Sequence, residues 1–219
     1  MAIYDTEEEQ LEQLKKWWDA NNTSLIAGVI TAIVLVTGWN LWQSHQREQR
    51  QEASQLYQNL LDSAAKNDNN AVEKLADQLA VEHGSLAYAH FAALEKAKSK
   101  VLQGDLEAAK AILQQQVQNP GSEELQHVAR LRLVQLMLAT GQYEQGLKLI
   151  AAVDPAKTEG FSASYDELEG DIYVAMDRLD EARNAYQNAI RTGQATAFAQ
   201  FKLDDIAAPV FDPATIETP

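Results

Sequence analysis

The sequence of 219 residues has no cysteine, only five prolines and few basic residues. The absence of cysteine excludes a disulfide framework, a cysteine zinc ribbon, an iron–sulfur site and a cysteine nucleophile. Because 18 Lys and Arg face 32 Asp and Glu, the formal net charge is −14, and so acidic a chain repels phosphate backbones. We therefore expect no nucleic-acid partner.

Signatures of catalysis and of metal binding are also missing. None of the ten glycines forms a G-x-G-x-x-G loop, a P-loop or a nucleophile elbow. The carboxylates that crowd a predicted helix start near Asp166 suit the helix dipole and solvation better than a paired-carboxylate hydrolase. The histidines stand singly, without the spacing of a metal site: His45, His83, His90 and His127. The sequence predicts a protein that is not an enzyme and has no cofactor and no metal.

Charge is absent from residues 20–44, which are mostly apolar. About 20 apolar residues in a helix cross a hydrocarbon core of about 30 Å. Indole rings favour the headgroup level, and every tryptophan of the chain lies at an edge of this stretch: Trp17, Trp18, Trp39 and Trp42. No A-x-A cleavage site follows, and the segment before it is acidic, so a cleaved signal peptide is disfavoured. We predict a transmembrane helix over residues 24–44, in contact with membrane lipid.

A short amphipathic leader, residues 1–23, precedes this span. Thr6 and Glu9 have the spacing of a capping box, and the following apolar positions share a helix face: Leu11, Leu14, Trp17 and Trp18. This face lies on the bilayer surface or docks on a neighbouring protein. The flanking positive charges, Lys15 and Lys16 against Arg47 and Arg50, hardly decide the topology, but the short leader favours a cytoplasmic amino terminus.

Residues 45–206 carry helical signals punctuated by Gly and Pro, which predicts an all-α body. The clearest helix pair follows the tetratricopeptide pattern, in which a small residue on the first helix admits a small residue on the second. Its first helix holds Leu168, Gly170 and Tyr173, its turn Asp177 and Leu179, and its second helix Ala182, Tyr186 and Ala189.

The turn at Asp177 has counterparts 36 residues earlier at Gly141 and another 37 earlier at Gly104. A degenerate first pair joins residues 52–66 to 71–81 across a polar turn at 67–70. A closing helix is expected over residues 195–206, followed by an extended tail, 207–219. The fold class is thus all-α: a single transmembrane helix followed by a tetratricopeptide-like solenoid of helical hairpins over residues 45–206.

In such a solenoid the first helix of each pair lines a concave wall where partners bind. Aligning the turns predicts a wall that changes from apolar to acidic along the solenoid. The alternative is that these residues are buried in ordinary helix contacts in the core. The predicted partner-binding residues are Tyr57, Leu60, Phe91, Leu94, Val101, Leu131, Gln135, Leu138, Glu167 and Asp171.

The whole chain resembles the ancillary SecYEG translocon subunits of the YfgM type. The resemblance rests on the acidic leader from Tyr4 to Glu9, the Trp17–Trp18 pair, one span, and a repeat body rich in alanine and glutamine that begins near Gln51. It implies a single-pass protein of the bacterial inner membrane with residues 45–219 in the periplasm. It also implies two partners, the SecYEG translocon and a membrane-anchored periplasmic chaperone of the peptidyl-prolyl isomerase type.

The sequence-based hypothesis is an adaptor that links translocating secreted proteins to periplasmic chaperones through protein–protein contacts. Two alternatives remain open, a regulator that sequesters a signalling protein and a scaffold of another envelope complex.

Overall fold

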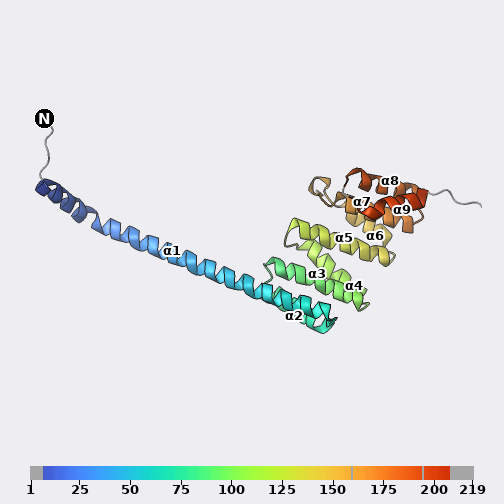
Figure 1. Ribbon diagram of the computed structural model, residues 1–219, viewed down its shortest axis with the longest axis horizontal. Coiled ribbons are helices and arrows are strands. Elements are labelled where there is room, and N and C mark those ends of the chain that lie inside the picture. The colour runs from blue at the N-terminus through green and yellow to red at the C-terminus, as the bar shows by residue number, and fades with distance from the viewer. Residues whose placement is uncertain (1–6, 159, 194, 208–219) are drawn as a thin grey trace, which may run out of the picture. The chain divides into compact units, whose positions relative to one another are not determined.

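The computed structural model describes residues 7–158, 160–193 and 195–207, and these ranges contain helices and no strand (Figure 1). The predicted all-α fold is confirmed. Thr6 of the predicted capping box and residues 208–219 of the predicted tail lie outside the described residues. The helices are α1 (Glu7–Ala65), α2 (Asn69–Glu82), α3 (Ala87–Leu102), α4 (Leu106–Gln118), α5 (Glu123–Ala139), α6 (Tyr143–Ala151), the short 3-10 helix η1 (Pro155–Lys157), α7 (Ser162–Ala175), α8 (Leu179–Arg191) and α9 (Ala197–Ala207).

The chain divides into two compact units between Glu52 and Ala53. The described part of the first unit is a single run of α1, and this helix is long and apolar enough to cross a membrane. Its large apolar side chains stand exposed, which is the state that lipid requires of a span. The boundaries of the predicted span, 24–44, fall inside this uninterrupted helix and stay a prediction.

Within the described residues the second unit repeats one turn at four places. The second residue after each first helix has a positive φ, of 56° at Asn67, 80° at Gly104, 75° at Gly141 and 58° at Asp177. At each turn the next amide donates to a carbonyl five residues back, as from Asp105 to Lys100 at 2.9 Å. This pairing is the Schellman motif, which satisfies the last carbonyls of a helix and reverses the chain. The predicted turns are therefore real and recur every 36 or 37 residues.

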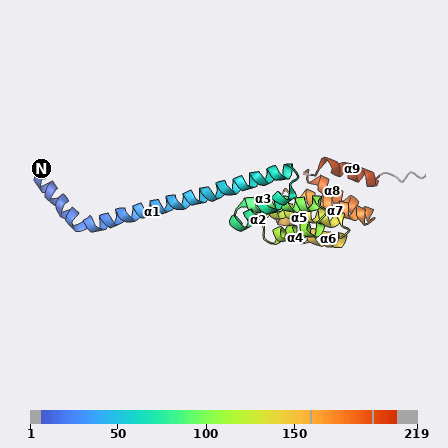
Figure 2. The ribbon, with the colours of Figure 1, turned by 90° about the horizontal axis from the view of Figure 1, so that it is seen from below.

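These turns produce four helix pairs, formed by the end of α1 with α2, α3 with α4, α5 with α6, and α7 with α8, and α9 follows the last pair. Figure 2, a view from below, shows the short helices of the second unit lying side by side (Figure 2). The expected closing helix, 195–206, is α9.

Buried alanines and leucines fill the space between successive helices, in three core clusters. Gly170 of α7 lies against an aromatic ring of α8. A Cβ at this position would lie 2.5 Å from the ring of Tyr186, which is fully buried. The missing side chain of Gly170 therefore makes room for this ring, a contact that the small-residue pattern did not predict.

Candidate partner-binding groove

The first helices of two consecutive pairs, α3 and α5, border a hollow of about 440 Å³. We call it the α3–α5 groove. Both helices bury one face in a common core with α4, and the edge of this core, together with the more exposed side chains beside it, lines the hollow. The lining residues are Leu94, Glu95, Ala97, Lys98 and Val101 of α3, Leu113 of α4, and Arg132, Gln135, Leu136 and Ala139 of α5.

Ion pairs to α2 fix the orientation of α3. Lys96 lies 2.6 Å from Asp77, and Lys100 lies 2.6 Å from Glu73. The hydrogen bond from Lys100 lowers the pKa of Glu73, so this carboxylate stays charged at neutral pH. The two lysines thus face the neighbouring pair, and the one between them, Lys98, is left on the groove side.

Aromatic rings join α3 to the first helix of the preceding pair. Tyr57 of α1 packs 5.8 Å from Tyr88 and 6.0 Å from Phe91, measured between ring centroids. Burial raises the pKa of Tyr57, the charge of Glu95 adds to this rise, and Arg132 opposes it. Both charged groups line the groove, whereas the three rings do not. Phe91 keeps 37% of its surface exposed.

The rim of the groove carries charges that are unequally paired. Lys98 lies 3.3 Å from Glu95, one turn away on α3. Arg132 has no ion pair or hydrogen bond with any other side chain among the described residues, so its five N–H groups are available to a ligand. The groove thus combines an apolar floor with the guanidinium of Arg132, which has no ion pair in the described part of the chain.

Three predicted wall residues, Leu94, Val101 and Gln135, line this groove. Sequence reasoning missed the other lining residues: Glu95, Ala97 and Lys98 of α3, Leu113 of α4, and Arg132, Leu136 and Ala139 of α5. In α5 position 135 was predicted, but the predicted positions 131 and 138 each differ by one residue from the lining positions 132 and 139. Since each residue turns a helix by about 100°, such a shift places a side chain on another face.

Other predicted wall residues lie in the core. Leu60 is fully buried between α1 and α2, and its expected exposure is corrected. Leu131 and Leu138 are half-buried and pack against the cluster of Val134, Leu168 and Ile172, which joins α5 to α7. These leucines are turned toward the next pair because the opposite face of α5 holds the groove.

The expected acidic end of the wall, Glu167 and Asp171 of α7, is closed. Lys202 of α9 lies 3.0 Å from Glu167 and 2.7 Å from Asp171. Asp171 also accepts a hydrogen bond from Tyr186 at 2.7 Å. Burial raises the pKa of Tyr186, and the hydrogen bond to Asp171 raises it further. The expected exposure of these carboxylates is corrected, whereas partner binding by any of the ten residues stays a prediction.

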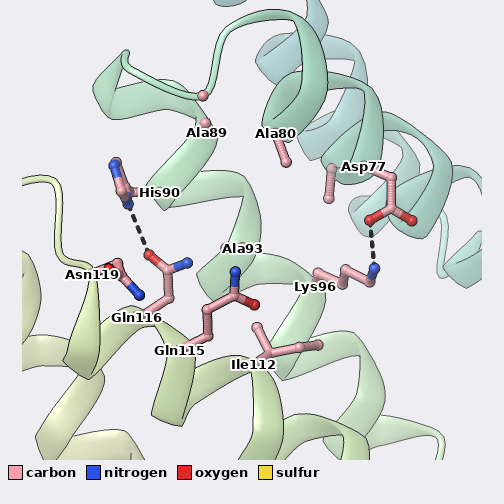
Figure 3. A pocket seen from close by; sticks show the side chains of 12 residues that line it. Asp77, Ala80, Ala89, His90, Ala93, Lys96, Ile112, Gln115, Gln116 and Asn119 are labelled. Carbon is pink, nitrogen blue, oxygen red and sulfur yellow. Dashed lines mark hydrogen bonds and ion pairs between the residues drawn. The ribbon is translucent and has the colours of Figure 1, made fainter.

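A second hollow, of about 280 Å³, lies among α2, α3 and α4, and Figure 3 shows it from close by. Asp77 and Lys96 pair at one end, and His90 Nδ1 lies 2.9 Å from Gln116 Oε1 at the other. Both polar pairs are satisfied within the chain. Alanines such as Ala80 and Ala93 line the space between them, so this hollow offers little side-chain chemistry to a ligand (Figure 3).

The buried His127 serves packing. His127 Nδ1 lies 2.8 Å from the Tyr165 hydroxyl and Nε2 lies 2.9 Å from the Lys157 carbonyl, and its ring stacks on Phe161. These contacts tie η1 to α5 and α7. Among residues 7–158, 160–193 and 195–207, no group of three histidine or acidic side chains is placed to hold a metal ion.

Comparison with known proteins agrees with this geometry. A family profile described as tetratricopeptide repeat-like domain matches residues 15–208. The ancillary SecYEG translocon subunit of Haemophilus influenzae is 33% identical over 94% of this chain and 100% of its own length. The chain belongs to this tetratricopeptide repeat-like family of ancillary SecYEG translocon subunits.

Members from other bacteria match over a similar extent. The ancillary SecYEG translocon subunit of Escherichia coli strain K12 is 29% identical over 94% of this chain and 100% of its own length. The one from Aggregatibacter actinomycetemcomitans is 31% identical over 86% of this chain and 91% of its own length. No solved structure matches the chain. The family and the apolar part of α1 together fit a single-pass protein of the inner membrane.

Proposed function

We propose that this protein is a non-enzymatic adaptor of the SecYEG translocon that binds a segment of a partner protein in the α3–α5 groove. The observation that carries this proposal is the groove itself, because its apolar floor and rim charges come from the first helices of two successive pairs. Tetratricopeptide-like solenoids bind their partners on that side. The names of the similar proteins support the translocon as the complex to which it is attached.

The groove suits an extended or helical segment with apolar side chains. Val101 offers exposed apolar surface onto which such side chains can be buried, at about 25 cal/mol for each Å² removed from water, and the nearly buried Leu94 and Leu136 line the same hollow. Arg132 on the wall offers a bidentate contact to a carboxylate of the same segment. Occupants of this kind are segments of secreted proteins in transit and a helix of the membrane-anchored chaperone of the peptidyl-prolyl isomerase type.

In this proposal the leader is cytoplasmic, α1 crosses the inner membrane, and the repeat body lies in the periplasm. Protease added to spheroplasts should digest the body and spare the amino-terminal residues. A body that is protected until detergent is added would contradict this topology.

The test of the groove compares two neighbouring aliphatic positions. Val101 lines the groove and is 41% exposed, whereas Leu102, next to it, is 69% exposed and does not line it. A photo-crosslinking amino acid placed at position 101 in intact membranes should capture translocon subunits, secreted chains or the chaperone, and at position 102 it should capture far less. Equal capture at both positions would show that the groove is not the contact.

Substitution gives the complementary experiment. Val101→Ser with Arg132→Gln should reduce capture of these partners from detergent-solubilised membranes, whereas Leu102→Ser should not. Both variants should melt close to the parent protein, since exposed positions contribute little to stability. Capture of a signalling protein instead of translocon components would favour the regulator, and capture of other envelope proteins would favour the scaffold.

A further inference from the structure

The leader part of α1 has one apolar face that no described residue covers. Leu11, Leu14, Trp17 and Trp18 are 65%, 61%, 52% and 50% exposed. Successive residues are about 100° apart in a helix, so these four positions share one side. Leu11, Leu14 and Trp18 line one common hollow with Lys15. We call this side the leader face.

The opposite side of the same helix is polar and already paired. It carries Glu9, Gln13 and Lys16, and Lys16 lies 3.1 Å from Glu12. Lys15 differs from Lys16 because it stands at the edge of the leader face and has no ion pair among the described residues. The leader helix therefore presents two large aliphatic chains and two indole rings on one side, with the ammonium group of Lys15 at the edge of that side.

A bend separates the leader from the apolar run that follows it. Both ribbon views show α1 changing direction within its amino-terminal third (Figures 1 and 2). A polar segment, Asn21 to Ser24, lies just before the apolar run, and the Asn21 side chain donates to the Trp17 carbonyl at 2.8 Å. Side chains that compete for helix carbonyls in this way bend helices. The bend allows the leader to take a direction different from that of the span.

We propose that the leader face lies in the headgroup layer of the membrane leaflet at the amino-terminal end of the span, with Lys15 facing lipid phosphates. We assign lipid as the occupant because the leader and the span are parts of one helix. A leader that bends away at the end of a span stays within reach of the bilayer surface. Amphipathic helices lie at this depth with their apolar side toward the acyl chains. Indole rings prefer the headgroup level, and a lysine at the edge of such a face reaches the phosphates.

The absence of cysteine from the sequence makes a direct test practicable, because every introduced thiol is the only one in the chain. The full-length protein is placed, one chain per disc, in nanodiscs of phosphatidylethanolamine and phosphatidylglycerol. Leu11→Cys and Leu14→Cys test the leader face, and Glu9→Cys and Gln13→Cys are matched controls on the polar side. The measurement is the labelling rate of each thiol by a water-soluble maleimide.

The proposal predicts labelling several-fold slower at positions 11 and 14 than at positions 9 and 13. Equal rates at all four positions would overturn it, because they describe a leader surrounded by water. Slow labelling at positions 11 and 14 only after purified SecYEG is added would also overturn it, because the leader face then docks on a protein. The first comparison of the four positions uses discs without translocon, so its result does not depend on the proposed adaptor function.

Two lysine variants test the phosphate contact. A lysine near an anionic surface contributes about 1 kcal/mol, or roughly a fivefold change in the equilibrium. Lys15→Gln should therefore speed the labelling of Leu11→Cys by up to about fivefold, and Lys16→Gln should change it much less. Equal effects of the two substitutions would contradict the assignment of Lys15 to the phosphates.

Discussion

The groove between α3 and α5 and the junction between α7 and α9 occupy equivalent places in the solenoid but differ in what fills them. At both places one side of a first helix faces the helix that begins after the next turn of the solenoid, which is α5 for α3 and the closing helix α9 for α7. Between α3 and α5 the facing residues include Ala97 and Ala139, which leave a hollow. At α7, Lys202 of α9 reaches Glu167 and Asp171 and closes the wall. The chemistry of single side chains, rather than the repeat, decides where this solenoid stays open.

The largest expected effect is within the last helix pair, next to the closed junction, where the ring of Tyr186 on α8 packs against Gly170 of α7. Gly170→Val would place side-chain atoms on the ring of Tyr186, and overpacking of this kind should lower the free energy of unfolding by about 3 kcal/mol. Ala175→Val, at an exposed position of the same helix, is the control. Urea denaturation of the two variants measures the difference. A Gly170→Val variant as stable as the control would mean that Tyr186 is not locked against α7.

The next effect compares two lysines. Lys202→Met leaves the nearly buried carboxylate of Glu167 without its cation and should destabilise the protein by about 1–2 kcal/mol. Lys98→Met in the groove removes only an exposed pair with Glu95 and should cost less than about 0.5 kcal/mol. Thermal melting of both variants tests the contrast. Equal losses would show that the two places do not differ in the way described.

A smaller effect should appear at high pH. Burial lowers the pKa of Lys202, but hydrogen bonds to Asp171 and Glu167 outweigh it, so the pKa is raised above its ordinary value of 10.5. A raised pKa means that the ammonium stabilises the fold fully below the ordinary value and that this stability is lost as pH rises through the higher one. The difference in melting temperature between the parent and Lys202→Met should therefore stay constant up to about pH 10.5 and shrink as pH rises further. A difference that stays constant well above pH 10.5 would assign the effect to packing.

The smallest effect on stability is expected at the open groove. Arg132→Gln should change the free energy of unfolding by no more than about 0.5 kcal/mol, because its guanidinium has no ion pair among the described residues. Chemical denaturation measures this value. A loss well above 1 kcal/mol would reveal a structural role and weaken the case for a ligand contact.

The turns could be predicted from the sequence because their chemistry is local. A left-handed residue, usually glycine, ends a helix, and the next residues start another. Gly104 and Gly141 carry this signal directly, and Asp177 carries it because aspartate tolerates positive φ better than most residues. A spacing of 36 or 37 residues then suffices to recognise the pairs.

The groove could be predicted only in part because α5 is apolar on more than one side. Leu131, Leu133, Leu136 and Leu138 leave no single polar face from which to fix its register. The structure resolves this by packing Leu133 and Leu136 with α4 and Leu131 and Leu138 toward α7. Arg132 and Gln135 then remain for the groove.

The closure by Lys202 had no sequence signal. Its partners lie 31 and 35 residues earlier, on a helix from a different pair. Neither a local motif nor a helical period connects residues at such separations, because contact between them depends on how α9 packs on α8. The acidic cluster at α7 looked like a free surface for this reason.

The four equivalent turns also bear on how the length of such a chain can change over evolution. Each turn uses its own backbone hydrogen bonds, so the end of any first helix is chemically interchangeable with the others. A duplication or deletion that starts at one turn and ends at the next joins two ends of the same geometry. The gene can thus gain or lose a helix pair in steps of 36 or 37 codons without changing the backbone conformation of the turn at the junction.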